Sequence, residues 1–200
     1  MKMNFKELVM KNRSYRGFDE SHKFSRSDLM ELVDYARLAP SAKNTQAMKY
    51  FLAWKKEDVD AIFPHTKWIG AWGEPGVLAD PPIPFEGTRP TAFIAIVQDC
   101  KIEEKLARFQ RDIGIFAYAI TLAAAERGLG CCMIGAFNAS EVKKAINLDD
   151  EYTPQLLIAI GKPAEEIVLT DAIDGDVGYY RDEKNVHYVP KRKLEDLILN

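Results

Sequence analysis

The chain has few cysteines and no long apolar run. Its three cysteines, Cys100, Cys131 and Cys132, are odd in number, and two of them are adjacent. This usage fits neither a disulfide framework nor spaced zinc ligands, so we expect a reducing, cytoplasmic setting. The longest unbroken apolar runs, such as residues 92–97, are far shorter than the roughly 18 residues that a membrane span needs. Residues 1–7 also lack the apolar core of a signal peptide, and we expect no membrane partner.

An excess of charge of either sign is also absent. The sequence has 27 basic and 30 acidic residues, a net charge of -3, and the two signs are interspersed. It has no basic face of the kind that binds nucleic acid, so we expect no nucleic-acid partner. The three histidines, His22, His65 and His187, are isolated and lack the spacing of metal ligands. We expect a structural or surface role for each of them and no metal site.

Length and composition are those of one domain. With 200 residues, 47% of them hydrophobic, the chain can bury about 70% of the surface that its unfolded form exposes. It contains no repeat, low-complexity tract or linker, so residues 1–200 are expected to form a single domain. Residues 64–90 hold many of the prolines and glycines together with Trp68 and Trp72. This composition predicts a variable loop or lid at about 64–90.

The spacing of apolar residues predicts the main helices and strands. A short amphipathic pattern predicts a helix that ends near Asn12. Ser25 with Asp28 is a capping box for a second helix, which Pro40 ends. By the same reasoning we expect further helices at residues 103–128 and at 141–147, the latter with Ser140 as its cap, and a short helix that runs through Leu197. We expect strands at 50–54, 91–99 and 156–160.

The helix expected at residues 103–128 is rich in alanine and apolar on most sides beyond Gly114. Such a helix must be buried, either at the centre of the fold or between subunits. The glycines from Gly128 to Gly135 superficially match a dinucleotide-binding fingerprint, but the last one is displaced and the segment does not join a strand to a helix. We therefore reject that reading, and we expect Cys131 and Cys132 to be small buried side chains without a catalytic role.

Residues 12–16 read Asn-Arg-Ser-Tyr-Arg and are expected to leave the first helix as a loop or strand. Arg13 and Arg16 are two guanidinium groups around the hydroxyl of Ser14. This pattern is suited to binding a phosphate and a second electron-rich group of one ligand. The alternative is a pair of solvated surface arginines.

A second polar segment, residues 39–46, follows the second expected helix. It combines Pro40, Ser41, Asn44 and Gln46, and the two carboxamides can each donate and accept hydrogen bonds to a planar heterocycle. The alternative is an ordinary polar helix exit, because these residue types favour turns. A third polar feature is the basic cluster 191–193 after Pro190. Taken alone, such a run is usually a solvated patch.

Several motifs in order resemble the nitroreductase family: residues 12–16, 39–46, 112–115, 126–130, 133–135, 160–163 and 190–192. The resemblance implies an α+β fold with a mixed, mainly antiparallel sheet flanked by helices. It also implies an intertwined homodimer with FMN in each of two interface sites, which would make the long helix a dimer element.

The resemblance also implies roles for individual residues. Arg13, Ser14 and Arg16 would hold the phosphate, the ribityl chain and the pyrimidine edge of FMN, and Lys191 and Arg192 would add basic groups at the phosphate. The remaining cofactor-binding residues would be Pro40, Ser41, Asn44 and Gln46 from the other subunit, together with Met133, Ile134 and Gly135 against the isoalloxazine.

The activity implied by the resemblance is an FMN-dependent oxidoreductase. FMN would take a hydride at N5 from NADH or NADPH and reduce a nitroaromatic, quinone or similar planar acceptor by a ping-pong mechanism, so no side chain is expected to be catalytic. Trp68, Trp72 and Phe85 are candidates to stack on the acceptor, and packing under a long loop is their alternative. Two rival functions stay open: another flavin chemistry such as reductive dehalogenation or dehydrogenation, and a non-catalytic FMN-binding sensor or store.

Overall fold

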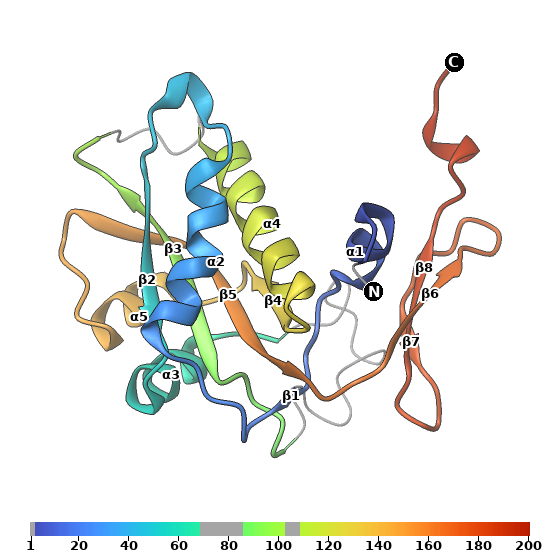
Figure 1. Ribbon diagram of the computed structural model, residues 1–200, viewed down its shortest axis with the longest axis horizontal. Coiled ribbons are helices and arrows are strands. Elements are labelled where there is room, and N and C mark those ends of the chain that lie inside the picture. The colour runs from blue at the N-terminus through green and yellow to red at the C-terminus, as the bar shows by residue number, and fades with distance from the viewer. Residues whose placement is uncertain (1–2, 69–85, 103–108) are drawn as a thin grey trace.

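The computed structural model (Figure 1) describes residues 3–68, 86–102 and 109–200. Trp72, Phe85 and the part of the expected long helix at residues 103–108 lie outside the described residues. The middle of the proposed loop at about 64–90 lies outside them as well.

A five-stranded sheet forms the centre of the molecule. Strand β5 (Tyr152–Pro163) pairs with β3 (Ala92–Asp99) on one side and with β4 (Gly130–Ile134) on the other. Strand β2 (Met48–Ala53) pairs with the outer edge of β3, and β1 (Phe18–Asp19) pairs with the end of β5. All of these pairs are antiparallel. Every residue of β3 is buried, as its unbroken apolar run predicts for a strand covered on both faces.

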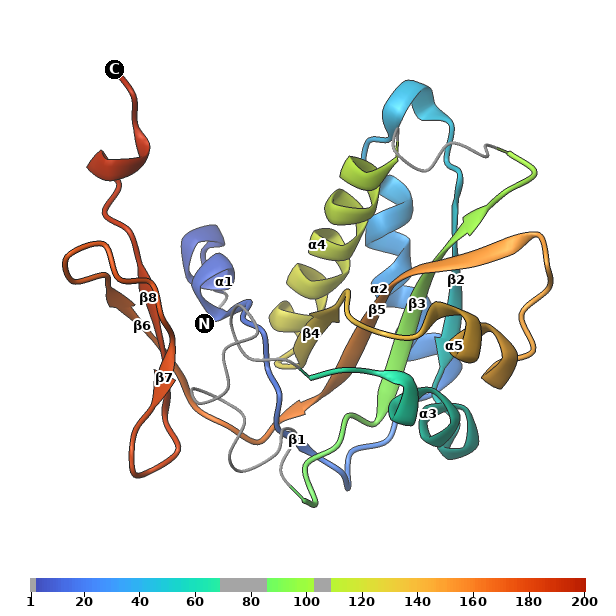
Figure 2. The ribbon, with the colours of Figure 1, turned by 180° about the vertical axis from the view of Figure 1, so that it is seen from behind.

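Helices cover both faces of this sheet (Figures 1 and 2). Helices α2 (Arg26–Leu38) and α4 (Gln110–Glu126) lie on one face, and the short helices α3 (Lys56–Ile62) and α5 (Ala139–Ala145) lie on the other. Two hydrophobic cores follow from this layering, one on each face of the sheet. The expected α+β class, helices flanking a mainly antiparallel sheet, is therefore confirmed.

Local capping signals set where several helices begin. The Asn4–Glu7 capping box opens α1 (Phe5–Lys11), and the predicted Ser25–Asp28 box opens α2, which ends at Leu38 before Pro40. The prediction that Ser140 caps the next helix is wrong. Asn138 is the N-cap of α5, because its Oδ1 accepts from the backbone of Glu141, and the Ser140 hydroxyl donates to the same oxygen.

Within the described residues α4 begins at Gln110, with Phe109 as its N-cap. Nine of its residues are buried, but Ile115 and Tyr118 are 41% and 42% exposed. One side of α4 is thus open in the single chain, although most of the helix is buried as predicted. The helix ends at Glu126, and Gly128 follows in a left-handed conformation with φ 75°.

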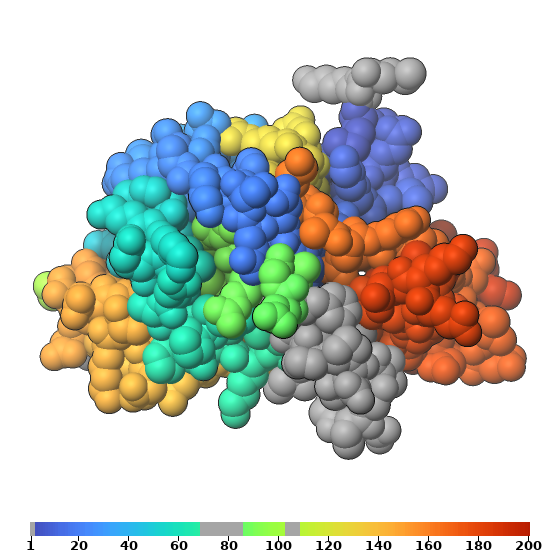
Figure 3. Space-filling view, turned by 90° about the horizontal axis from the view of Figure 1, so that it is seen from below, coloured from blue at the N-terminus to red at the C-terminus, as the bar shows by residue number. Residues whose placement is uncertain are grey.

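A second, three-stranded sheet stands at one end of the molecule. Strand β6 (Ile167–Asp171) is parallel to β8 (His187–Lys191), and β7 (Tyr180–Arg181) is antiparallel to β8. Helix α1 lies beside this sheet (Figures 1 and 3). Beyond β8 a short 3-10 turn, Glu195–Leu197, matches the predicted C-terminal helix, whereas the sequence patterns did not reveal β6, β7 or β8.

Two glycines let the N-terminal segment lie directly on the sheet. Gly130 of β4 pairs with Gly161 of β5. A Cβ at Gly130 would lie 2.7 Å from Cγ of Tyr15, and a Cβ at Gly161 would lie 2.6 Å from Cδ1 of the fully buried Phe18. Only residues without a side chain allow this close approach, which holds the chain from Tyr15 to Phe18 in place.

We expect Gly161→Ala to lower the free energy of unfolding by about 1–3 kcal/mol, because the new methyl group overpacks a buried aromatic ring. Gly17→Ala is the matched control, since its Cβ would meet Glu165 at an ordinary distance of 3.6 Å. That variant should be neutral or more stable by up to about 1 kcal/mol. Chemical denaturation of both variants checks the expectation, and equal stability of the two would contradict it.

Candidate functional site

The segment from Asn12 to Arg16 runs from the end of α1 to β1, between β4 and the second sheet (Figure 1). Ser14 forms an isolated parallel bridge with Cys131 of β4, and the backbone N–H of Tyr15 donates to the Cys131 carbonyl at 2.9 Å. The segment is therefore extended, as predicted, and is anchored to the sheet through its backbone.

One buried carboxylate joins this segment to the second sheet. Glu165, just after β5, accepts hydrogen bonds from the backbone N–H groups of Arg16 and Gly17, the latter at 3.0 Å. The same carboxylate forms an ion pair with Arg181 of β7. The side chains of Glu165 and Arg181 are only 5% and 10% exposed. Sequence reasoning missed both residues, because nothing in their spacing distinguishes them from surface charges.

A small cavity, which we call the basic cavity, lies between the 12–16 segment and the second sheet. Its volume is about 120 Å³. An adjacent cavity of about 200 Å³, here the α4–β4 cavity, lies between the same segment and the main sheet. The basic cavity is lined by Arg13, Ser14, Arg16, Ile167, Tyr179, His187, Val189 and Lys191. The α4–β4 cavity is lined by Asn12, Arg13, Ser14, Tyr118, Thr121, Cys131 and Met133.

The basic cavity concentrates positive charge. Arg13 donates through Nη2 to the Val9 carbonyl at 2.8 Å, but its buried Nε has no hydrogen-bond partner among the described residues. Burial and the nearby Arg13 charge hold the pKa of Lys191 below its usual range. Four of the predicted binding residues, Arg13, Ser14, Arg16 and Lys191, therefore meet in a site whose donors are suited to an anion.

Arg16 lies at the side of the basic cavity. Its guanidinium is 5.4 Å from the centroid of the Tyr179 ring, and its Nη1 donates to the Ser14 carbonyl at 3.1 Å. The charge of Arg16 also reaches Cys132 on β4, where it opposes the effect of burial on the pKa of that thiol. Arg16 is thus positioned between the second sheet and β4.

His187 forms part of the wall of the basic cavity and is only 2% exposed. Its ring packs edge-on against Tyr179, with 5.2 Å between the centroids, and neither ring nitrogen has a hydrogen-bond partner among the described residues. Burial, reinforced by the charges of Arg181 and Arg16, lowers the pKa of His187 to about 4. The imidazole is therefore neutral at physiological pH, and its place in the cavity was not foreseen from the sequence.

The end of β4 borders the α4–β4 cavity. The Met133 side chain is 40% exposed and lines this cavity, whereas Ile134 is buried in the core on the other face of the sheet. A Cβ at Gly135 would meet no atom within 4 Å, so the space in front of it is open. A ligand at this strand end could touch the side chain of Met133 but only the backbone of Ile134.

Cys131 and Cys132 alternate along β4, so each side chain enters a different core. Burial raises the pKa of both thiols, that of Cys132 to about 11. The prediction that both are small buried side chains is confirmed. Their surroundings favour the thiol over the reactive thiolate.

The second polar segment does not meet the first within this chain. The turn that contains Asn44 lies beyond the end of α2, at the far edge of the molecule from β1 (Figures 1 and 2). Lys43, Asn44 and Gln46 all have left-handed backbones, with φ of 54°, 54° and 52°. Such strained residues are uncommon outside glycine and cluster at functional sites.

Buried and local hydrogen bonds hold this strained turn. The carboxylate of Asp112 in α4 accepts from the Ala42 backbone at 2.9 Å, and Ser41 Oγ accepts from the Gln46 backbone at 3.3 Å. The Gln46 carboxamide in turn donates to Asn44 Oδ1 at 3.1 Å. These hydrogen bonds fix the turn within its own chain.

Other predicted residues lie away from the two cavities. Arg192 follows β8, is exposed and lines neither of them. Trp68 packs against Phe63 with 6.2 Å between the ring centroids and donates to Thr66 Oγ1, so the structure supports packing for it. Within the described ranges, no group of three or more His, Cys, Asp or Glu residues could hold a metal ion, and no helix is long and apolar enough to span a membrane.

Comparison with known proteins gives consistent matches. The family model "Nitroreductase family" matches residues 9–162. "Putative NAD(P)H nitroreductase MhqN" of Bacillus subtilis is 29% identical over 185 residues, covering 81% of this chain and 90% of that protein. A nitroreductase family protein from Streptococcus pneumoniae has a similar structure, with a TM-score of 0.64 at 21% identity over 85% of this chain and 96% of the other.

A third match is a structure described as that of a putative nitroreductase in complex with FMN, from Exiguobacterium sibiricum. Its TM-score is 0.62 at 20% identity, and the match covers 82% of this chain and 90% of that one. At this level of identity the two structural matches establish the fold.

We expect Glu165→Gln to lower the free energy of unfolding by about 3–5 kcal/mol, because it removes the charge of one partner of a buried ion pair. The exposed pair Arg37–Asp34 provides the control, since both side chains are more than half exposed. Asp34→Asn should change stability by less than about 1 kcal/mol. Denaturant unfolding measures both. A loss for Glu165→Gln no greater than for Asp34→Asn would contradict this role of Glu165.

Proposed function

The chain belongs to the nitroreductase family, and from this membership we propose that it is an FMN-dependent oxidoreductase. In this proposal NADH or NADPH supplies the electrons, and a nitroaromatic, quinone or similar planar compound accepts them. The name of the Bacillus relative includes an NAD(P)H nitroreductase activity, and the Exiguobacterium structure contains FMN. Both names support the assignment of the cofactor and of the donor class.

The single observation that carries the proposal is the basic cavity beside the end of β4. Its unsatisfied Arg13 Nε and the partly desolvated Lys191 are suited to a phosphate. In the adjacent α4–β4 cavity, whose wall also carries polar side chains, the exposed Met133 offers an apolar contact for a ring. The two cavities share Arg13 and Ser14, so one ligand with a phosphate at one end and a planar ring at the other fits both.

We propose a role for each side chain on this basis. Arg13, Ser14 and Lys191 bind the phosphate and ribityl chain, with Arg192 adding charge at the same end. Arg16 holds a positive charge at the pyrimidine edge, where a reduced flavin gathers negative charge. When bound, FMN supplies the chemistry of electron transfer between the nicotinamide donor and the acceptor. The protein contributes position and electrostatics.

We further propose a homodimer in which each flavin site is completed by the partner subunit's Pro40, Ser41, Asn44 and Gln46. The strained turn at these residues lies at the far edge of the molecule from β1 and from the 12–16 segment (Figure 1). Tyr35 and Leu38 on α2, with Ile115 and Tyr118 on α4, are exposed and provide apolar surface for such an association. Obligate interfaces bury upward of roughly 2,000 Å² and are rich in such groups.

The visible spectrum of the purified protein tests the cofactor assignment. We expect flavin bands after purification or after addition of FMN, and we expect NADH or NADPH to bleach them without oxygen. Steady-state assays with nitroaromatic, quinone and halogenated acceptors then identify the reaction. Absence of flavin binding would refute the proposal, and a bound flavin that neither nicotinamide reduces would indicate a sensor or store instead.

We expect Arg16→Ala to weaken FMN binding by about 1.5–3 kcal/mol, the usual contribution of a charge-assisted hydrogen bond. It should also lower the reduction potential of the bound flavin, because the lost charge favours the reduced form. Fluorescence titration and a potentiometric titration measure the two effects. Lys144→Ala, which removes an exposed charge on α5, is the control. An unchanged potential would show that Arg16 does not face the pyrimidine edge.

Mixing two inactive variants tests the shared site. In a heterodimer of Arg16→Ala and Asn44→Ala chains, one site carries both changes and the other carries none. Co-refolding should therefore restore up to about one quarter of the wild-type activity, since half of a random mixture is heterodimer with one intact site each. No recovery despite confirmed heterodimer formation would exclude sites shared in this way.

A further inference from the structure

His187 is a buried polar residue that the proposed binding roles do not use. In β8 the side chains of His187, Val189 and Lys191 all line the basic cavity, as expected for alternate residues of one strand. Both ring nitrogens of His187 lack a hydrogen-bond partner within the described part of the chain. Buried polar groups are paired in most folded proteins, so an imidazole with two unpaired nitrogens beside a cavity indicates a group that occupies the cavity.

The charged groups around His187 do not satisfy it. The Glu165 carboxylate, which follows β5, is already bound to Arg181 of β7 and to the backbone of Arg16 and Gly17. From the 12–16 segment, Arg13 and Arg16 face the same cavity, and Lys191 faces it from β8. Lysine and arginine side chains can only donate hydrogen bonds, so none of these three cations can accept one from the imidazole N–H. Tyr179 meets the imidazole with its ring.

We propose that His187 is a phosphate-binding residue, which donates a hydrogen bond to the phosphoryl group of the flavin nucleotide and takes up a proton from solvent when that group binds. This inference rests on the proposed function, since it assumes that the ligand is FMN. The cavity volume of about 120 Å³ accommodates a phosphoryl group with a few further atoms but not a three-ring heterocycle. His187 therefore meets the phosphate end of the ligand and not its ring.

Charge explains the proposed uptake of a proton. Without an anion, the cations of the cavity and the burial of the ring oppose protonation, and the imidazole stays neutral. A phosphoryl group brings a charge of about -1.5 to -2 at neutral pH. It offsets those cations and adds an acceptor, so the pKa of His187 rises on binding. By linkage, the contribution of His187 to FMN affinity should grow as the pH falls through the pKa of the complex.

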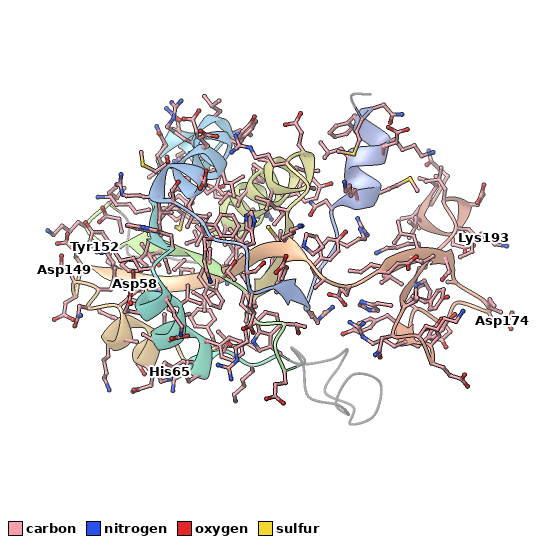
Figure 4. The ribbon with its side chains drawn as sticks, turned by 60° about the horizontal axis from the view of Figure 1, so that its bottom comes forward. Asp58, His65, Asp149, Tyr152, Asp174 and Lys193 are labelled. Atoms are coloured by element: carbon pink, nitrogen blue, oxygen red, sulfur yellow. The ribbon has the colours of Figure 1, made fainter. Side chains whose placement is uncertain are left out.

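Two substitutions of His187 and one control test this proposal. His187→Phe removes both nitrogens and keeps a flat ring, whereas His187→Gln keeps a neutral donor and acceptor but cannot take up a proton. His65→Phe is the control, because His65 lies at the opposite end of the molecule from the residues that follow β8, such as Lys193 (Figure 4). FMN and riboflavin are titrated into each apoprotein at pH 8 and pH 6, with flavin fluorescence as the readout.

We expect His187→Phe to bind FMN at least ten-fold more weakly than wild type, with riboflavin affinity changed less than two-fold. The apoprotein of this variant should be at least as stable as wild type, because two unpaired polar atoms are removed. His187→Gln should bind FMN with intermediate affinity at pH 8. The ratio of its dissociation constant to that of wild type should rise at pH 6. Protonation of the FMN phosphate itself cancels in this ratio.

The outcomes separate this inference from the proposed function. Unchanged FMN affinity of His187→Phe, or equal loss for FMN and riboflavin, would overturn the role of His187 while leaving the function intact. If His187→Phe does not fold, the test rests on His187→Gln. An equal ratio of its FMN dissociation constant to that of wild type at pH 8 and pH 6 then overturns the proposed role of His187. Failure of the wild-type protein to bind FMN would instead refute the proposed function.

Discussion

The candidate site depends on the hydrogen bonds and the ion pair that the buried carboxylate of Glu165 forms. This carboxylate accepts hydrogen bonds from two successive backbone N–H groups of the N-terminal segment and pairs with Arg181 of the second sheet. The basic cavity lies between these two parts of the chain, so its walls are held together by one residue that belongs to neither. Because removal of one partner of a buried ion pair is costly, the relative position of the two walls is strongly constrained.

The positive charge of the basic cavity has two opposite effects. Arg13 and Lys191 stabilise an anion, and burial of Lys191 beside Arg13 already lowers its pKa. The same surroundings disfavour a charge on His187 and keep it neutral. A ligand that neutralises the cations reverses this effect. In our proposal the cavity couples the binding of an anion to the protonation of a buried group through electrostatics.

The distance between the two polar segments underlies the proposal of a dimer. The 12–16 segment runs between β4 and the second sheet, whereas the turn at residues 42–46 lies beyond α2, at the far edge of the same chain (Figure 1). The turn has three non-glycine residues with left-handed backbones and is fixed by Asp112 of α4. Such strain persists only where the surrounding structure determines it. The geometry agrees with a turn that serves a neighbouring copy of the chain.

The sequence by itself determined the features that depend on neighbours along the chain. The Ser25–Asp28 capping box, the apolar strand β3 and the extended segment around Ser14 follow from local spacing and chemistry, and the motifs identified the family. Only the tertiary structure decided which polar residues are buried and which of them meet. Glu165 and His187 have ordinary sequence surroundings, and their roles arise because β5, β7, β8 and the N-terminal segment converge. The burial of Ile134 was likewise decided by the tertiary structure, since the pairing of β4 with β5 sets which face of the sheet each side chain of β4 enters. Local patterns encode secondary structure, whereas burial and charge pairing depend on contacts between residues far apart in the chain.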